Sequence, residues 1–340
     1  MKISFLVTYY NQEAYVRQSM DSILAAEKPA EWEILCGDDG SSDGTKAVIS
    51  EYVAKDPEHI RMFEMPREEG TRYDSVRRAS ANRLNLLEHC SGECFCTLDG
   101  DDFYTDTAFA TEAVGIFEKY PEVTLAAFGY REYQDGEFGG FRGVSFSAGG
   151  ILEKRKYLRD GYIHAGACVH RIGWGRERMA YLKELGYFDD NNIVLNTLNF
   201  GEAYYTARPV YAYRQTGVSV FTSMACVEKS MLNVQGMDVD LKLMDPKRRK
   251  DLMSRYANPL ITVWVFRKKL RETLGEEKYR KYLDGCRNIG DSIGETLLTW
   301  NEQGPDRKKE VSRMIRAVAA DNPLRAVSAC LNTVCRGGTK

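Results

Sequence analysis

Three aspartates, Asp99, Asp101 and Asp102, lie within four positions in the stretch CTLDGDDFY (96–104). Carboxylates this close repel one another, and a shift of one pKa unit corresponds to about 1.4 kcal/mol. A turn needs only one aspartate, so the other two predict a ligand that offsets the crowding. Oxygen ligands at this density suit Mg²⁺ or Mn²⁺, which proteins often bind together with phosphate oxygens. The stretch therefore predicts a site for a divalent cation and a diphosphate.

Polar clusters also follow two other apolar runs of the chain. They are TYYN (8–11) and GDDGSSDGT (37–45). Taken singly, the first is also typical of a strand end with core tyrosines, and the second of a turn or a helix cap. In open parallel sheets, however, ligands bind beyond the carboxyl ends of the strands. Three clusters, each after its own strand, therefore predict one shared pocket.

The elements that must position these clusters alternate between strand and helix. Apolar, β-branched runs are followed by stretches whose apolar residues recur at helical spacing, and three such βα units occur in a row. This order predicts an α/β fold with a mostly parallel sheet flanked by helices. The predicted strands are 2–10, 31–40, 60–66 and 94–99, and the predicted helices begin near residues 11, 41 and 74.

The pattern changes after residue 121. The alternating run 122–146 contains a Gly-rich turn and predicts a hairpin or an edge-strand excursion rather than another crossover. The runs 162–172 and 203–214 predict further strands around a helix that contains FDDNNIVLNTL (188–198).

Helical patterns dominate the last third of the chain. Strand patterns end near Phe221, which predicts one domain at 1–220 and a helical C-terminal region at 221–340. In this region Asp245 predicts a helix cap, and Pro246 predicts the first helical position. The basic segments of the region fit a helical lid or a layer that forms a homodimer, and they also fit contact with an anionic membrane surface. These segments are KRRK (247–250), RKKLRE (267–272) and RKK (307–309).

Composition excludes several classes of protein. With 47 basic and 49 acidic residues the net charge is −2, so no overall basic field is available to bind nucleic acid. No apolar run approaches the ~20 residues of a membrane-spanning helix. Nine cysteines, an odd number, together with no secretory leader, predict a reduced, cytoplasmic protein. Cys90, Cys94 and Cys96 are predicted to be small buried hydrophobes rather than metal ligands.

The motifs together resemble those of the family 2 glycosyltransferases of the GT-A fold. The resemblance covers roughly residues 2–220 and rests on ISFLVTYYNQEAYVRQSMDSIL, EILCGDDGSSDGT and CFCTLDGDDFY, in that order. It implies an inverting transferase of the hexosyltransferase type that takes a sugar from a nucleoside-diphosphate donor, a UDP-sugar for preference. The acceptor would be a saccharide or a lipid-linked saccharide in surface polysaccharide biosynthesis. The implied cofactor is Mn²⁺ or Mg²⁺, and the implied location is cytoplasmic, including the inner face of the plasma membrane.

The resemblance also assigns residues that would bind the nucleobase. The end of the first strand holds the base in this family, which implies Thr8 and Tyr10, with Asn11 at the start of the following helix. The second aspartate after the second strand accepts a hydrogen bond from uracil, which implies Asp39.

The DxD-type motif of the family matches Asp99, Asp101 and Asp102. One carboxylate of this motif contacts the ribose and another binds the metal. The resemblance implies Asp101 as a metal ligand, with Asp102 as the second choice.

The family's catalytic base belongs to an acidic pair at the start of a helix, which implies Asp190 as the base with Asp189 as its neighbour. Helix capping is the alternative explanation for this pair. Many relatives carry Glu where this chain has Asp189, and a metal- or phosphate-directed His where this chain has Thr216. His164 or His170 could replace that histidine, although a histidine in a strand is more often a structural residue.

Arg77, Arg78 and Arg83 lie on the helix predicted at 74–88. In relatives this helix directs an Arg-Asn pair toward the donor, and Asn82 with Arg78 is the nearest match. Most of these arginines are predicted to lie on a solvated face.

Two other functions compete with glycosyl transfer. A sugar nucleotidyltransferase generally carries a Gly-rich, basic phosphate loop after its first strand, where this chain has TYYNQEAY (8–15). A non-catalytic relative that binds a nucleotide sugar or a glycan would not need Asp101, Asp102 and Asp190 together.

Overall fold

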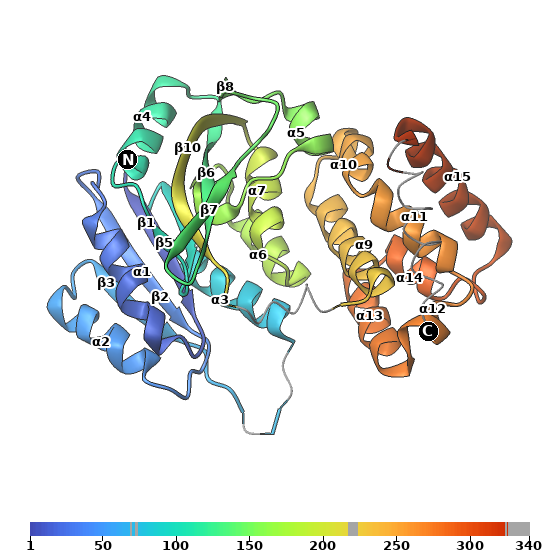
Figure 1. The fold of residues 1–340 in the computed structure, drawn as a ribbon, viewed down its shortest axis with the longest axis horizontal. Coiled ribbons are helices and arrows are strands. Elements are labelled where there is room, and N and C mark those ends of the chain that lie inside the picture. Colours follow the sequence, from blue (N-terminus) through green and yellow to red (C-terminus); the bar gives the residue numbers. More distant parts are fainter. Residues whose placement is uncertain (69, 72–73, 217–223, 324, 326–340) are drawn as a thin grey trace. The chain divides into compact units, whose positions relative to one another are not determined.

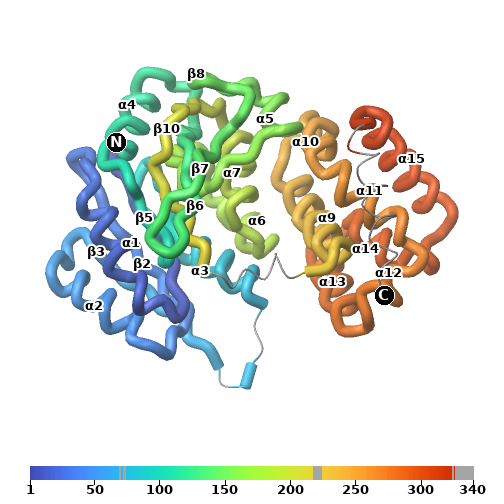
Figure 2. Tube along the Cα trace, in the orientation of Figure 1, coloured from blue at the N-terminus to red at the C-terminus, as the bar shows by residue number. Residues whose placement is uncertain are grey.

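The computed structural model describes residues 1–68, 70–71, 74–216, 224–323 and 325. The chain divides into two units, Met1–Tyr157 with Gly161–Gly217, and Leu158–Asp160 with Val218–Lys340. Figures 1 and 2 follow the chain through both. The boundary predicted near residue 220 lies outside the described residues.

A ten-stranded mixed sheet forms the centre of the first unit (Figure 1). Its strands are β1 (Ile3–Tyr9), β2 (Trp32–Asp38), β3 (Ile60–Glu64), β4 (Cys94–Asp99), β5 (Phe103–Tyr104), β6 (Val123–Gln134), β7 (Glu137–Arg142), β8 (Gly149–Ile151), β9 (Cys168–Arg171) and β10 (Glu202–Arg214). The order is β3-β2-β1-β4-β9-β6-β10-β5, with β7 paired to β6 and β8 paired to β10. The first four strands of this order are parallel, so the carboxyl ends of β2, β1 and β4 lie side by side.

Helices cover both faces of this sheet. The helices of this part of the chain are α1 (Glu13–Ala25), α2 (Thr45–Lys55), α3 (Ser75–His89), α4 (Phe109–Lys119), α5 (Lys154–Asp160), whose last three residues belong to the second unit, the 3₁₀ turn η1 (Ala165–Ala167), α6 (Arg176–Leu185) and α7 (Asp190–Leu198). On one face, α1, α2 and α4 share a core with alternate residues of β1 and β2, such as Ile34 and Cys36. On the opposite face α3 approaches β2 so closely that a Cβ on Gly37 would lie 2.1 Å from Asn82 Oδ1. Glycine is therefore required where α3 crosses the sheet.

The strands predicted at 2–10, 31–40, 60–66 and 94–99 are confirmed as β1 to β4. The hairpin alternative for 122–146 is also confirmed, because β6 and β7 pair antiparallel around Asp135 and Gly136, both with positive φ. Figure 2 traces this hairpin. The edge-strand alternative applies to β7, which among the described strands pairs with β6 alone, whereas β6 lies inside the sheet between β9 and β10. Both neighbours come from later in the chain, which a local pattern does not reveal.

The described part of the second unit is helical and contains no strand. Its helices are α9 (Cys226–Leu243), the 3₁₀ turn η2 (Pro246–Arg248), α10 (Arg249–Arg255), α11 (Ala257–Phe266), α12 (Leu270–Leu274), α13 (Glu276–Ile289), α14 (Ile293–Leu298) and α15 (Pro305–Asp321). Apolar residues of α9, α11, α13, α14 and α15 form its core. Asp245 caps η2 by accepting a hydrogen bond from Lys247 N at 2.9 Å, with Pro246 in the first position as predicted. Among the residues described, none of the helices has the length and apolar character needed to cross a bilayer.

Candidate donor site and catalytic pair

The carboxyl ends of β1, β2 and β4 border a cavity of about 350 Å³ in the first unit. It is lined by Thr8, Tyr9, Tyr10, Gln12, Asp39, Arg67, Ser75, Ala79, Asn82, Arg83, Asp99 and Asp101. The three polar clusters that the sequence singled out therefore lie around one hollow. Residues of α3 and of the segment after β3 complete its wall.

Asp99 ends β4 and is held by two donors. Thr8 Oγ1 donates to Asp99 Oδ1 at 3.1 Å, and Arg83 Nη2 donates to the same oxygen at 2.7 Å. Burial alone would raise the pKa of Asp99, but the Arg83 guanidinium, together with His164 and Thr8, more than offsets it, so the pKa of Asp99 is lowered. The carboxylate therefore stays ionised at neutral pH. The next residue is Gly100, where a Cβ would lie 2.1 Å from the Tyr9 ring, so only glycine permits this tight turn.

Asp101 presents a half-buried carboxyl group to the cavity. Burial raises the pKa of Asp101, and the charge of Asp99 raises it further. A bound cation would counter both effects, so this residue fits a divalent metal. Its backbone carbonyl accepts a hydrogen bond from Arg214 Nε at 2.5 Å, which fixes the turn. Among the described residues, no group of three or more His, Cys, Asp or Glu side chains is arranged to hold a metal ion.

Asp102 faces β10 rather than the cavity. It is 1% exposed, one carboxylate oxygen accepts from Tyr211 OH, and the other accepts from Arg214 N at 2.7 Å. Burial raises the pKa of Asp102 well above its usual range, and the charge of Asp101 adds to this. These contacts brace the turn after β4 against β10. The geometry therefore favours Asp101 over Asp102 as the metal ligand.

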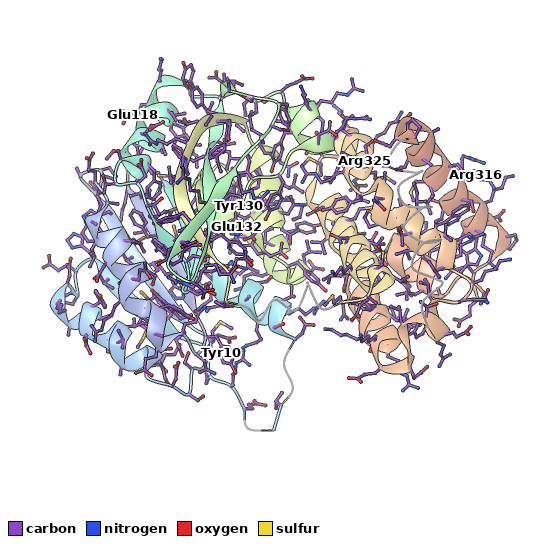
Figure 3. The ribbon with its side chains drawn as sticks, viewed as in Figure 1. Tyr10, Glu118, Tyr130, Glu132, Arg316 and Arg325 are labelled. Atoms are coloured by element: carbon purple, nitrogen blue, oxygen red, sulfur yellow. The ribbon has the colours of Figure 1, made fainter. Side chains whose placement is uncertain are left out.

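Tyr10 and Asp39 border the other end of the cavity. Tyr10, labelled in Figure 3, is 44% exposed, and the Arg67 guanidinium lies 3.8 Å from the centre of its ring. Arg78 Nε donates to Asp39 Oδ1 at 2.6 Å, and Arg67 donates to Asp39 Oδ2. An ionised carboxylate has about four acceptor positions, so Asp39 keeps capacity for a further donor. The pair of arginines fixes its orientation.

Asn11 braces two loops at this end of the site. Its side-chain Oδ1 accepts from Ser42 N at 2.8 Å, and its own N–H donates to Ser41 Oγ at 2.9 Å. The residue has φ +50°, a left-handed conformation that asparagine tolerates better than most residues. Asn11 thus joins the turn after β1 to the turn after β2, and α1 begins two residues later, at Glu13.

The prediction that most arginines of α3 lie on a solvated face was wrong. Arg83 is buried against Asp99, and Arg78 is paired with Asp39. Asn82, on the same side of the helix, donates to Gly37 O at 2.9 Å. Arg77 instead lies 5.0 Å from the centre of the Tyr187 ring. The charge pattern of the sequence does not indicate that one face of α3 contacts the aspartates at the ends of two strands, Asp39 after β2 and Asp99 in β4.

The two aspartates at the start of α7, Asp189 and Asp190, make different contacts. Asp189 is the N-cap residue and forms a capping box with Asn192, whose Oδ1 accepts from Asp189 N at 3.5 Å. Burial raises the pKa of Asp189 to about 6, and the charge of Asp190 contributes. The Asp190 side chain is 33% exposed, and its Oδ2 lies 3.4 Å from His164 Nε2. The capping explanation therefore applies to Asp189, while the Asp190 carboxylate lies beside His164.

Arg83 connects this pair to the donor motif. Burial would lower the pKa of Arg83, but the negative charges of Asp99 and Asp190 raise it. One guanidinium group thus experiences the negative field of both carboxylates.

The two candidate histidines differ sharply. His170 is fully buried, with Nδ1 2.9 Å from Thr197 Oγ1 and its ring stacked on Phe95 at 4.9 Å. Burial lowers the pKa of His170 to about 3, so it is a neutral structural residue. His164 is the one in contact with Asp190. Thr216 is exposed, and the residues that follow it in QTGVS lie outside the described part of the chain.

Several contacts of the site were not predicted from the sequence. Arg67 lies beyond β3 in a segment without a recognisable motif, and Gln12 lines the cavity beside Tyr10. Tyr211 and Arg214 belong to the strand sequence YAYR (211–214), for which the sequence indicated no role in the site. Residues three apart on a strand point to opposite faces, so strand spacing gave no signal that both would contact the turn after β4.

An open α/β sheet that gathers carboxylates at the ends of adjoining parallel strands defines a class of nucleotide-binding folds. Within that class, the chain belongs to Glycosyl transferase family 2, whose family model matches residues 4–180. The predicted family and fold class are thereby confirmed.

Relatives of known sequence match part of the chain. The poly-beta-1,6-N-acetyl-D-glucosamine synthase of Staphylococcus epidermidis is 34% identical over 193 residues, 56% of this chain and 43% of that protein. The putative glycosyltransferase EpsE of Bacillus subtilis is 26% identical over 174 residues, 50% of this chain and 58% of that protein. An uncharacterised protein of Mycobacterium bovis is 30% identical over 135 residues, 39% of this chain and 37% of that protein. The match thus spans less than two thirds of each relative.

A solved structure resembles the chain over most of its length. The crystal structure of S. aureus TarS 1–349 in complex with UDP-GlcNAc aligns with a TM-score of 0.59 and 15% identity, covering 93% of this chain and 92% of that one. At this identity the likeness concerns the fold.

Proposed function

We propose that this chain transfers a sugar, with inversion, from a nucleoside-diphosphate sugar to a hydroxyl group of a saccharide or lipid-linked acceptor. UDP is the nucleotide that we favour. The observation that carries the proposal is the cavity at the ends of β1, β2 and β4, where Asp39, Asp99 and Asp101 face one hollow. The relative named for poly-beta-1,6-N-acetyl-D-glucosamine synthesis supports a role in surface polysaccharide formation.

The chain's own residues would hold the donor as follows. The ring of Tyr10 offers an exposed face to the nucleobase, and Asp39 offers an acceptor oxygen to a base N–H. The ionised Asp99, with Thr8 beside it, would accept from ribose hydroxyls. Arg83 brings a buried positive charge to the position where the diphosphate would begin.

Asp101 fits Mn²⁺ or Mg²⁺ because of its half-buried carboxyl group beside a second negative charge. When bound, such a cation would neutralise the charge that develops on the departing diphosphate. Asp102, Tyr211 and Arg214 would support Asp101 by fixing the turn that carries it.

Asp190 would act as the base for the acceptor. As the acceptor oxygen forms its bond to C1 of the sugar, the hydroxyl proton passes to the Asp190 carboxylate. The bond between C1 and the diphosphate oxygen breaks at the same time, and its electron pair leaves with the nucleoside diphosphate. The partly exposed position of Asp190 allows an acceptor to approach.

The donor assignment is tested by calorimetry of UDP with Mn²⁺ and by a transfer assay over common nucleotide sugars. Asp101→Asn should weaken Mn²⁺-dependent UDP binding at least about 10-fold. Asp106→Asn is the matched control, because Asp106 pairs with Arg208 Nε at 3.2 Å and does not line the cavity. Undiminished UDP binding by Asp101→Asn would contradict the metal assignment.

The base is tested separately. Asp190→Asn should leave UDP binding within about twofold and lower the transfer rate by about 10²- to 10⁴-fold. Normal transfer by this variant would move the base to another residue. Absence of transfer by the unaltered protein with every donor and metal would refute the enzymatic proposal itself.

We also propose a cytoplasmic location, at the inner face of the plasma membrane when the acceptor is lipid-linked. Lys308, Lys309, Arg313 and Arg316 of α15 border an open hollow of about 450 Å³, and Figure 3 labels Arg316. Such a basic surface suits anionic lipid. Cosedimentation with anionic but not zwitterionic vesicles is expected. A dimeric mass without vesicle binding would favour the alternative, a homodimer formed through the C-terminal helices.

A further inference from the structure

We propose that His164 is a positioning residue that fixes the Asp190 carboxylate for proton transfer. The inference rests on the proposed glycosyl transfer and adds to it a residue for which the sequence offered no such role. His164 precedes the turn η1, and Asp190 begins α7, yet His164 Nε2 and Asp190 Oδ2 lie 3.4 Å apart. A small side-chain rotation closes this gap to an ordinary hydrogen bond.

The backbone selects the tautomer of His164. Its Nδ1 accepts a hydrogen bond from Gly166 N at 3.2 Å, as the cap of η1. In the neutral ring the proton must then be on Nε2, which is the nitrogen that faces Asp190. The imidazole is therefore arranged to donate to the carboxylate.

Aromatic side chains hold the ring in this orientation. His164 is 5% exposed, and the centre of its ring lies 4.9 Å from that of Tyr211, 5.0 Å from that of Tyr213 and 5.5 Å from that of Tyr130, which Figure 3 labels. At Gly166 a Cβ would lie 2.5 Å from the Tyr211 ring, so the turn packs directly on this cluster. A ring enclosed in this way cannot rotate freely, and its donor direction is preorganised.

This arrangement assigns different tasks to the two oxygens of Asp190. Oδ2 faces the imidazole, which leaves Oδ1 to receive the proton of the acceptor hydroxyl. His164 keeps its own proton throughout and relays none, because its Nδ1 is occupied by Gly166 N. Asp189, committed to the helix cap, leaves the base role to its neighbour.

Two substitutions separate positioning from packing. His164→Asn keeps an oxygen that can accept from Gly166 N but is too short to reach Asp190, whereas His164→Gln carries an amide nitrogen near the place of Nε2. We expect kcat to fall about 10- to 100-fold in His164→Asn and to stay within about threefold in His164→Gln. The donor KM and the UDP affinity should change less than twofold in both. Equal loss of kcat in the two variants, or no loss in either, would overturn the proposal.

A double-mutant cycle with Asp190→Asn gives a readout that a merely structural role would not move. If His164 acts through Asp190, His164→Asn should lower the residual rate of Asp190→Asn no further. A further fall of 10-fold or more in that background would overturn the positioning role. If the unaltered protein transfers sugar, and Asp190→Asn lowers the transfer rate as expected, the proposed function stands and only the His164 inference is under test.

Discussion

Replacement of Asp189 tests the electrostatics of the catalytic pair through folding stability. Asp189 is the N-cap of α7, where burial raises its pKa from 3.8 to about 6, with a further contribution from the charge of Asp190 and an opposing one from Arg83. Asp189→Asn removes the titrating group and keeps a residue type that caps helices well.

The effect of Asp189 on the free energy of unfolding follows from its pKa in the unfolded chain, 3.8, and its pKa in the folded chain, about 6. Below pH 3.8 the Asp189 carboxyl is protonated in both the folded and the unfolded chain. As the pH rises, the unfolded chain releases this proton first, while the folded chain holds it until about pH 6. The free energy of unfolding therefore decreases through this window. At about 1.4 kcal/mol for each pH unit, the total loss is about 3 kcal/mol.

Urea-dependent hydrogen exchange at peptides from α7 measures the free energy of unfolding locally, at pH 4 and at pH 7.5. The difference between the unaltered protein and Asp189→Asn should favour the unaltered protein by about 2.4 kcal/mol more at pH 4 than at pH 7.5, because at pH 4 part of the unfolded population has already released this proton. In an Asp190→Asn background this pH-dependent part should shrink, because a neighbouring negative charge is gone. A difference that does not change with pH would refute the electrostatic reasoning.

Three further predictions concern the surroundings of the site. Tyr211→Phe removes the hydroxyl donor to buried Asp102 and should destabilise the first unit by about 1.5 to 3 kcal/mol, as read from the urea midpoint; an unchanged midpoint would show that the hydrogen bond contributes nothing. Arg83→Gln should weaken UDP binding in calorimetry at least about 10-fold, whereas Arg77→Gln on the same helix should change it less than twofold; equal effects would contradict the placement of these side chains. Gly37→Ala should destabilise by about 1 to 3 kcal/mol, because its Cβ would lie 2.1 Å from a side-chain oxygen of α3, and a melting temperature equal to that of the unaltered protein would argue against so close an approach.

Much of the fold could be predicted from local patterns. Three of the four parallel strands, β1, β2 and β4, are largely apolar and buried because both faces of the sheet are covered, and the helices between the strands carry apolar residues at helical spacing. The interior place of β6 could not be predicted, since its partners β9 and β10 come from chain segments that follow it. Strand order depends on contacts between distant segments, and a local pattern contains no record of them.

The sequence by itself determined which carboxylates gather at the sheet edge. In a parallel sheet, the carboxyl ends of neighbouring strands lie at the same edge. This arrangement brings Asp39, Asp99 and Asp101 to one cavity. Only the tertiary structure decided how each is used. Asp102 turns to β10 and Asp189 to its helix cap, while His164 reaches Asp190 from another element. Sequence spacing indicates which end of an element a side chain occupies, but the direction it faces depends on partners that only folding brings within reach.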